Sequence, residues 1–564
     1  MPMRIRNILH IETQNTTTAA FVVAVSFGVS ALLGLIRDRL LASRFGADKN
    51  LDVYFTAFRI PDFVYGLVVV GGLTAALLPV LSEYLQKEEY GEDRQTVIWS
   101  NGGQLMVNNV LACFSLILLA FCGLLFILTP LIIRLIAPGF SADQILTTIA
   151  LTRFMFLSPL ILGISNLVSG VLQYSNRFLS YSLAPLFYNF GIILGILFFV
   201  PTVGLIGLAW GVVFGASLHL LIQMPAFLSS GFRFKPILRF NHPGLLKIFK
   251  MMIPRIIGQA SYHFNLIFIT AIASTMVSGS IAIFNFSNNL QWFPVGMIGV
   301  SFAVAAFPDL SRFWANGRYD EFIEKITSSL KQILFLIIPI SVGTLLLRAQ
   351  IVRLILGTGR FGWTETRLTA ASLGIFAFGI IAASAVPLIT RAFFSLKDTR
   401  TPVIVAISST AINLFLSILL VRIFTAGIDG LVSNDKFVSL VATLFRVNGL
   451  GHIEVLALPI ALFVSSVFQA LMLWILLTMK IKKISDPVDV IWQNAVGSLK
   501  ICLTKIVISA TIMSIVVYLS LAIVGRFVDM QTFGGVLLQS LTGGLLGLLA
   551  YLFVAYLLNR RSYQ

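Results

Sequence analysis

Long apolar runs separated by short polar loops dominate the chain. Each run holds about 20 residues or more, the length at which a helix crosses roughly 30 Å of hydrocarbon. The pattern predicts about fourteen transmembrane helices and therefore an all-α, polytopic membrane protein. The predicted spans are 18–36, 55–82, 103–136, 146–172, 179–200, 204–228, 248–276, 280–311, 327–356, 369–396, 402–424, 453–479, 499–525 and 534–558.

Positive charges gather in alternate loops. Lys and Arg favour the cytoplasmic side of a membrane, so this pattern predicts an inner-membrane protein with both termini in the cytoplasm. The loops near Arg44, Arg360 and Lys436 depart from it. The loops assigned to the cytoplasm contain Arg4, Arg6, Lys87, Arg94, Arg177, Arg233, Lys235, Arg239, Lys247, Lys250, Arg312, Arg318, Lys325, Lys397, Arg400, Lys480, Lys482, Lys483, Arg560 and Arg561.

An internal repeat divides the predicted helices into two lobes. Residues 75–93 and 304–321 share a proline, a Leu-Ser pair and a polar turn, and Asn189 and Asn413 occupy similar places in the two halves. Such a repeat is typical of transporters built from two related halves. It predicts an N-terminal lobe (1–230), an interfacial linker (231–250), a C-terminal lobe (251–484) and two extra helices (485–564).

In the predicted linker, aromatic and aliphatic residues interleave with Arg233, Lys235 and Arg239. This composition is typical of a segment that lies on the cytoplasmic surface of a membrane. Two interpretations stay open at this point: the linker binds lipid headgroups, or it serves only as an anchor.

Composition supports the membrane assignment. The 564 residues are 57% hydrophobic and 11% charged, whereas about 25% of residues are charged in soluble domains. The net charge of +17 lies in short loops, so it indicates topology and contact with anionic lipid rather than nucleic-acid binding. The three cysteines lie in apolar runs without metal-ligand spacing and are interpreted as packing residues.

The first two predicted helices carry charges at their junction. Arg37 and Asp38 follow the first apolar run, Asp52 and Arg59 open the second, and Pro61 makes the second helix breakable. Charged residues at membrane depth usually mark function. This helix pair is therefore a candidate wall of a polar cavity.

Several motifs in this order resemble a known family. The chain is similar to the MurJ/MviN lipid II flippases, within the superfamily of multidrug, oligosaccharidyl-lipid and polysaccharide exporters. The longest match is the sequence RAFFSLKDTRTP, which contains Arg391, Lys397, Asp398 and Arg400. Other matches are GLIRD at 34–38, RFGA at 44–47, FRIP at 58–61, APGF at 137–140, NRF at 176–178, WFP at 292–294 and GRF at 359–361. An extra segment near 426–451 lies outside the resemblance.

The resemblance implies a function. Family members move an undecaprenyl-diphosphate-linked peptidoglycan precursor across the cytoplasmic membrane by alternately opening a cationic cavity. A diphosphate cannot cross lipid unpaired, because even one charge at mid-bilayer costs several kcal/mol. Arginines offer such a group paired donors. We assign substrate binding to Arg37, Asp52, Arg59, Arg255 and Asn289.

The chain departs from the family at this cavity. Where the family has cations, this sequence has Ala31, Tyr65 and, in the eighth helix, Asn289. The sodium site of some relatives is also altered, because its acids correspond to Ile269 and Ser417. These losses leave open a second hypothesis, in which the protein is a membrane scaffold of envelope synthesis that does not transport, or exports another polyprenyl-linked glycan.

Each candidate residue also has a structural interpretation. Arg37 and Asp38 can form a charge cluster at a helix end, Asp52 can cap the second helix, and the motif around Asp398 can hold two helices together. His219 and His263 are more typical of helix packing than of ligation. No phosphate-binding loop of the Gly-Lys-Ser/Thr type occurs, so we predict no enzyme, cofactor or metal, and as partners a lipid II-like glycan, membrane lipids and cell-wall synthesis proteins.

Overall fold

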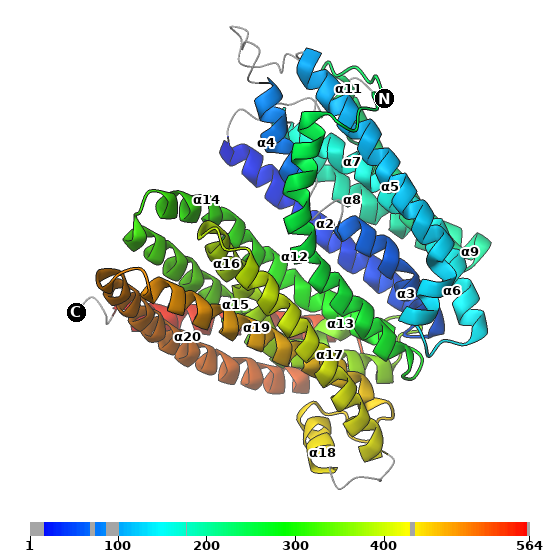
Figure 1. The fold of residues 1–564 in the computed structure, drawn as a ribbon. Coiled ribbons are helices and arrows are strands. Elements are labelled where there is room, and N and C mark those ends of the chain that lie inside the picture. The colour runs from blue at the N-terminus through cyan, green and yellow to red at the C-terminus, as the bar shows by residue number, and fades with distance from the viewer. Residues whose placement is uncertain (1–15, 68–73, 86–100, 176, 429–434, 561–564) are drawn as a thin grey trace. The chain divides into compact units, whose positions relative to one another are not determined.

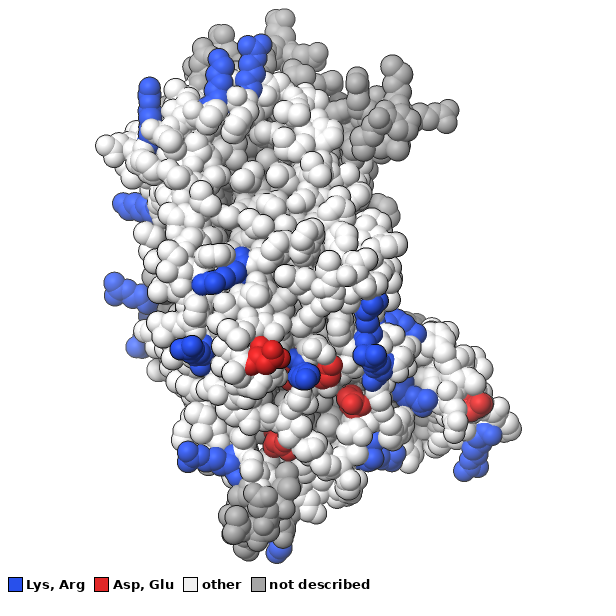
Figure 2. All heavy atoms as spheres, turned by 90° about the vertical axis from the view of Figure 1, so that its right-hand side faces the viewer, with Lys and Arg blue, Asp and Glu red and all other residues white. Residues whose placement is uncertain are grey.

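The computed structural model describes residues 16–67, 74–85, 101–175, 177–428 and 435–560. Every regular element in these ranges is a helix, so the prediction of an all-α fold is confirmed. Charged side chains cover little of the face shown in Figure 2, most of which is neither acidic nor basic. A surface of this kind suits a membrane protein.

The contacts divide the chain into two compact units. Unit 1 contains Met1–Leu41 and Asp48–Thr275, and unit 2 contains Ala42–Ala47 and Met276–Gln564. By these contacts the helix after the predicted linker packs with unit 1. The lobe boundaries derived from the internal repeat stay a prediction.

Unit 1 is built from helices of very different lengths (Figure 1). Its elements are α2 (Thr16–Phe45, whose last residues belong to unit 2), α3 (Lys49–Val64), α4 (Thr74–Leu85), α5 (Asn101–Ile136), α6 (Ala142–Met155), α7 (Leu157–Tyr174), α8 (Phe178–Leu194), the π-helix η2 (Gly195–Phe199), α9 (Val200–Val203), α10 (Ile206–Leu221), α11 (Met224–Leu228) and α12 (Pro243–Ser274).

Unit 2 contains the remaining helices. They are α13 (Ser280–Pro294), the π-helix η3 (Val295–Val300), α14 (Ser301–Ala315), α15 (Tyr319–Ile355), α16 (Trp363–Ser395), α17 (Arg400–Ile428), α18 (Asp435–Leu444), the 3₁₀-helix η4 (Ile453–Leu456), α19 (Ala457–Lys482), α20 (Asp486–Phe527) and α21 (Phe533–Arg560). The segment outside the family resemblance contains α18, whose Phe437, Leu440 and Leu444 are exposed.

Within the described residues, eleven helical segments are long and apolar enough to cross a membrane. They correspond to eleven of the fourteen predicted spans. The other three predicted spans fall on α2, on α3 with α4, and on α12, where a shorter apolar stretch covers Ala260–Ser274. A multi-pass membrane protein is confirmed, and the count of fourteen stays a prediction.

The core of unit 1 forms around one row of α5. Met106, Val110, Phe114, Leu118 and Cys122 recur every four residues, so they line one face of the helix, and all are buried. This face packs against residues of α4, α7 and α12. Periodic apolar spacing therefore produces the core that the sequence pattern predicted.

Two helices change from α to π geometry just after a proline. Tyr65–Leu67 continue α3 as a π turn four residues after Pro61, and η3 follows Pro294 directly. Proline removes a backbone donor, and π turns are frequent at functional sites. The chain stays helical from residue 49 to residue 67, so the breakable character of the second helix stays a prediction.

Candidate functional site

Arg37 lies in α2 at the centre of a hydrogen-bond network with α8. Its Nε and Nη2 donate to Asp38 Oδ1 at 3.0 and 2.9 Å, and its Nη1 donates to Asn189 Oδ1 at 3.1 Å. Asn189 in turn donates to the backbone and side-chain oxygens of Ser30, both at 3.3 Å. The network fixes the guanidinium between two helices of unit 1.

The network leaves part of Arg37 available to a ligand. A guanidinium has five N–H donors, and three of them donate to described residues, so these residues leave one N–H on each Nη. The side chain is 24% exposed, whereas Asp38 is 6% exposed. N–H groups on a charged planar group suit the oxygens of a phosphate.

A second polar cluster joins α3 to α12, which contacts α3 within unit 1 (Figure 1). Arg59 Nε donates to Thr270 Oγ1 at 2.8 Å, and His263 Nδ1 lies 3.9 Å from Asp62 Oδ2. Arg59 and Asp62 are one turn apart on α3, so they share a face. The two helices run antiparallel here, because Arg59 meets the later of the two α12 residues.

Gly66 makes this second cluster possible. A Cβ added to Gly66 would overlap the imidazole ring of His263. The ring also packs edge-on against Phe63, with 6.2 Å between the ring centres. The missing side chain therefore creates the space in which His263 reaches Asp62.

Asp52 lies in the first turn of α3 and is 3% exposed. The residue that caps this helix is Asp48, whose side chain accepts from the backbone N–H groups of Asn50 and Leu51. The capping interpretation of Asp52 is therefore wrong. Its role in substrate binding stays a prediction.

The remaining predicted site residues differ in what the structure says of them. Ala31 is half-buried in α2, Tyr65 is half-buried in the π turn after α3, and Asn289 is half-buried in α13 of unit 2. Arg255 belongs to α12, but its side chain is outside the described part of the structure. A common cavity for all of them stays a prediction.

The long motif that contains Arg391 builds a turn between α16 and α17. Asp398 Oδ1 accepts from the backbone N–H groups of Arg400 and Thr401, both at 3.0 Å, and Oδ2 pairs with Lys480 of α19. Lys397 has a positive φ of 57°, and Arg391 donates to the backbone oxygen of Val300 at 3.3 Å. This geometry favours the structural interpretation of the motif.

Comparison with known proteins identifies the family. The family model described as "Lipid II flippase MurJ" matches residues 41–536. The chain belongs to the lipid II flippase MurJ family. The probable lipid II flippase MurJ of Buchnera aphidicola subsp. Acyrthosiphon pisum is 30% identical over 71% of this chain and 77% of that protein. The corresponding protein of Vibrio cholerae serotype O1 is 26% identical over 71% of this chain and 76% of that protein.

Solved structures agree on the fold. The chain resembles a structure described as "Lipid II flippase MurJ, inward closed conformation" with a TM-score of 0.70, at 22% identity, over 96% of this chain and all of that chain. An inward-facing MATE-family transporter of the MOP superfamily gives a TM-score of 0.62 at 14% identity, over 82% of this chain and 99% of that chain. These likenesses show a transporter fold shared by both families.

The alteration of the sodium site that the family resemblance implies stays a prediction. Ile269 is a buried apolar residue, and Ser417 offers a hydroxyl in place of a carboxylate. Sodium and other hard cations are held by oxygen ligands that usually include carboxylates. Among the described residues no group of three or more His, Cys, Asp or Glu is arranged to hold a metal ion.

The prediction that His219 serves helix packing is confirmed, since it is buried and its Nδ1 lies 2.7 Å from Ser165 Oγ.

The sequence did not identify Asp62 as a partner of His263. The available signal was the three-residue spacing from Arg59, which puts both on one helix face. Nothing in the sequence indicated that Gly66 would admit a ring from α12.

Proposed function

We propose that this MurJ-family protein is a lipid II flippase. It moves an undecaprenyl-diphosphate-linked peptidoglycan precursor from the cytoplasmic to the outer leaflet by alternating access. Family membership and the relatives named as lipid II flippases support this proposal. The substrate leaves chemically unchanged, so the protein acts as a transporter and not as an enzyme.

The observation that carries the proposal is the Arg37 network at the end of the apolar run of α2. A cation beside an apolar run is costly unless it is paired, and Asp38 and Asn189 stabilise it while the described residues leave one N–H on each Nη available. A diphosphate that binds there exchanges part of its hydration shell for charge-assisted hydrogen bonds from Arg37. The polyprenyl tail can remain in the surrounding lipid.

We place the substrate contacts at Arg37, Asp52, Arg59, Arg255 and Asn289. Arg59 and His263 add donors on α3 and α12, beside the π turn that contains Tyr65. His263 thus adds a donor near Tyr65, a position where the family has a cation.

Orientation and partners complete the proposal. Loop charges favour an inner-membrane location with both termini in the cytoplasm. Export of an anion from a negative interior is then favourable by roughly 2.3 kcal/mol per charge per 100 mV. Cell-wall synthesis proteins that make or use the precursor are the proposed protein partners.

A second candidate function is a scaffold of envelope synthesis that does not transport. The substitutions at Ala31, Tyr65 and Asn289 favour it, because they remove cations from the cavity that the family uses. An exporter of another polyprenyl-linked glycan is compatible with the same substitutions.

Complementation separates these functions. The full-length gene is expressed in cells depleted of their own lipid II flippase, and growth is compared between wild type and an R37Q/D38N double variant. The double change removes the cation without leaving the buried Asp38 charge unpaired. We expect wild type to restore growth and the double variant to fail at equal membrane abundance.

A matched control uses Arg153 of α6, which contacts Phe126 and belongs to neither polar cluster. An R153Q variant should restore growth like wild type. Failure of wild-type protein that is properly inserted would favour the scaffold or another glycan. If cells that express R37Q/D38N grow like wild type, Arg37 does not belong to the substrate site.

A further inference from the structure

The segment between α11 and α12 is fixed to α5 by two consecutive buried asparagines. Asn108 Nδ2 donates to the backbone oxygen of Arg233 at 2.9 Å, and Asn108 Oδ1 accepts from Lys235 N at 2.8 Å. Asn109 makes the same pair of bonds with the backbone oxygen and nitrogen of Arg239, at 3.0 and 2.7 Å. We call residues 231–242 the strap.

The backbone of the strap bonds to α5, and apart from the buried Phe232 and the half-buried Ile237 the side chains from residue 232 to residue 240 are exposed. Phe234, Leu238 and Phe240 are 62, 58 and 49% exposed, and Arg233, Lys235 and Arg239 are exposed between them. Large apolar residues in this number are rarely left in water beside charges. Alternating apolar and basic side chains match the boundary between lipid headgroups and acyl chains.

The strap cations have no acidic partner in the described structure. No carboxylate of a described residue pairs with Arg233, Lys235 or Arg239, and the sequence has no Asp or Glu between Asp143 and Asp309. Lys247, just beyond the strap, differs because its Nζ contacts both carboxylate oxygens of Glu83 at 2.5 and 2.7 Å. The strap therefore carries charge that the described fold does not neutralise.

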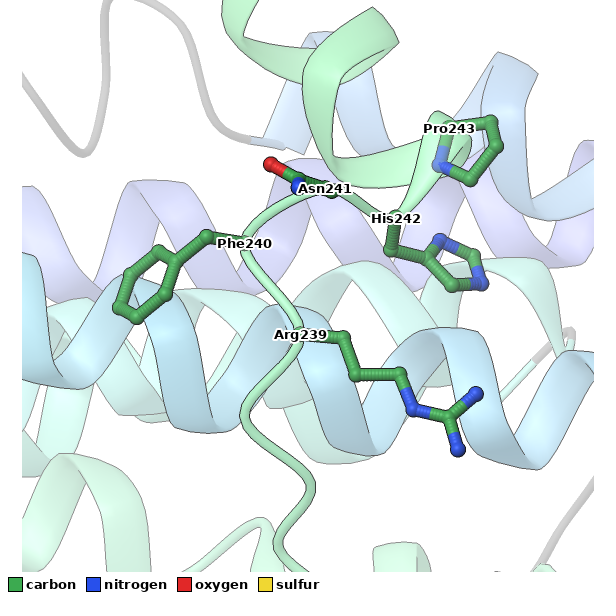
Figure 3. Close-up of a pocket in the computed structure, with 5 residues that line it drawn as sticks. All are labelled: Arg239, Phe240, Asn241, His242 and Pro243. Carbon is green, nitrogen blue, oxygen red and sulfur yellow. The ribbon is translucent and has the colours of Figure 1, made fainter.

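One end of the strap forms a hollow of about 500 Å³ lined by Arg239, Phe240, Asn241, His242 and Pro243. Figure 3 shows the side chains of Arg239 and His242 on one side of the chain and that of Phe240 on the other. The ring of Tyr84 lies against that of His242, with 5.6 Å between centres, and helps to hold it.

His242 is held as a neutral donor. Partial burial and the nearby charge of Arg239 lower the pKa of His242, so the ring is neutral at pH 7. Its Nδ1 accepts from the backbone N–H of Gly244 at 3.2 Å. The single proton of the neutral ring is therefore on Nε2, which can donate to a ligand.

We propose that the strap is a binding site for an anionic phospholipid of the adjacent leaflet. The guanidinium of Arg239 and the Nε2–H of His242 bind the phosphate, Arg233 and Lys235 attract the negative surface, and Phe234, Leu238 and Phe240 insert among the acyl chains. This site lies within unit 1 and does not depend on the proposed flippase function.

A lipid fits this surface better than a soluble phosphate. A soluble anion would contact only the cations, whereas a phospholipid contacts the cations with its phosphate and the three exposed apolar side chains with its acyl chains. The strap also follows α11, which ends the span Ile206–Leu228. A segment that follows a membrane span so closely lies at the membrane surface. The second interpretation from the sequence, a passive anchor, does not require the arrangement of Arg239 and His242.

Photo-crosslinking in vesicles tests the site. The full-length protein is reconstituted in phosphatidylcholine with increasing photoactivatable phosphatidylglycerol, and the label on residues 231–250 is quantified. Each surface cation contributes about 1 kcal/mol, or about fivefold, to binding of an anionic membrane. We expect R239Q to raise the half-saturating lipid fraction about fivefold and the triple variant R233Q/K235Q/R239Q about a hundredfold.

The control is the double variant E83Q/K247Q, which removes a neutral ion pair and keeps the net charge, and it should leave half-saturation unchanged. The triple variant should unfold at the wild-type temperature, since the asparagine bonds involve only the strap backbone. Equal labelling by photoactivatable phosphatidylcholine, or unchanged half-saturation in the triple variant, would overturn the proposal. Full competition by soluble glycerol phosphate would do the same, because it would indicate a site for free phosphate.

Discussion

Two charged regions carry the strongest family motifs, and they use their charges differently. In the Arg37 network, the described residues leave two N–H donors of a partly exposed guanidinium available at the end of the apolar run of α2. In the Asp398 turn, the carboxylate is 12% exposed and accepts bonds from Arg400, Thr401 and Lys480. The longer sequence match thus belongs to the Asp398 turn, whose charged groups are already bonded to other parts of the protein.

This difference teaches that the length of a motif does not measure contact with substrate. A turn that joins three helices depends on several nearby residues, because Asp398 caps one helix, pairs with Lys480 of another and follows Lys397 at positive φ. A binding arginine constrains few neighbours, since its partners come from another helix. Variants in the two regions should accordingly separate transport from stability.

The largest expected effect is on transport, at Arg37. D38N alone should keep transport within about threefold of wild type, because it leaves the cation. The R37Q/D38N double variant should lose at least tenfold, since one charge-assisted pair contributes about 1.5–3 kcal/mol. Rates of lipid II translocation in reconstituted vesicles check this. Equal rates for the two variants would make the Arg37 network a structural cluster like the Asp398 turn.

A G66A variant should come next, by forcing the His263 ring away from Asp62. Insertion of a methyl group into a packed site costs about 1–3 kcal/mol, observed as a lower unfolding temperature. The G66A/H263A double variant removes the overlap and should regain most of that stability. If G66A and H263A act additively in thermal unfolding, the two positions do not share the space that the structure assigns to them.

The Asp398 turn should respond in stability and little in transport. D398N keeps the side-chain shape and removes the charge that pairs with Lys480, and we expect a loss of about 1–2 kcal/mol. Transport measured below the unfolding temperature should stay within about twofold of wild type. A complete loss of transport in a folded D398N protein would assign the turn a direct role in the conformational cycle.

The pH dependence of stability gives the smallest effect. Partial burial acts to raise the pKa of Asp398, but the hydrogen bonds from Lys480 and Thr401 outweigh it and lower the pKa to about 2. Because the ordinary value is about 3.9, the stabilisation is complete above about pH 4 and is lost as the pH falls toward 2. The difference in unfolding temperature between wild type and D398N should shrink over that interval. A difference that is constant from pH 5 to pH 2 would contradict this cause.

Much of this fold was predictable because hydrophobic periodicity acts locally. The row from Met106 to Cys122 and the apolar helices follow from spacing alone, and Arg37 was identified by charge in an apolar setting. Contacts between distant residues were not predictable. Asp62 meets His263 across some two hundred residues, and the asparagine bonds to the strap depend on how α5 packs.

The most direct test of the central claim measures the exposure of lipid II at the outer leaflet. Cells depleted of their own flippase express wild type, R37Q/D38N or the R153Q control at equal membrane abundance. A probe that cannot enter the cell then quantifies outward-facing lipid II. The account predicts exposure with wild type and R153Q and at least tenfold less with R37Q/D38N. Full exposure with R37Q/D38N, or none with wild type, would contradict it.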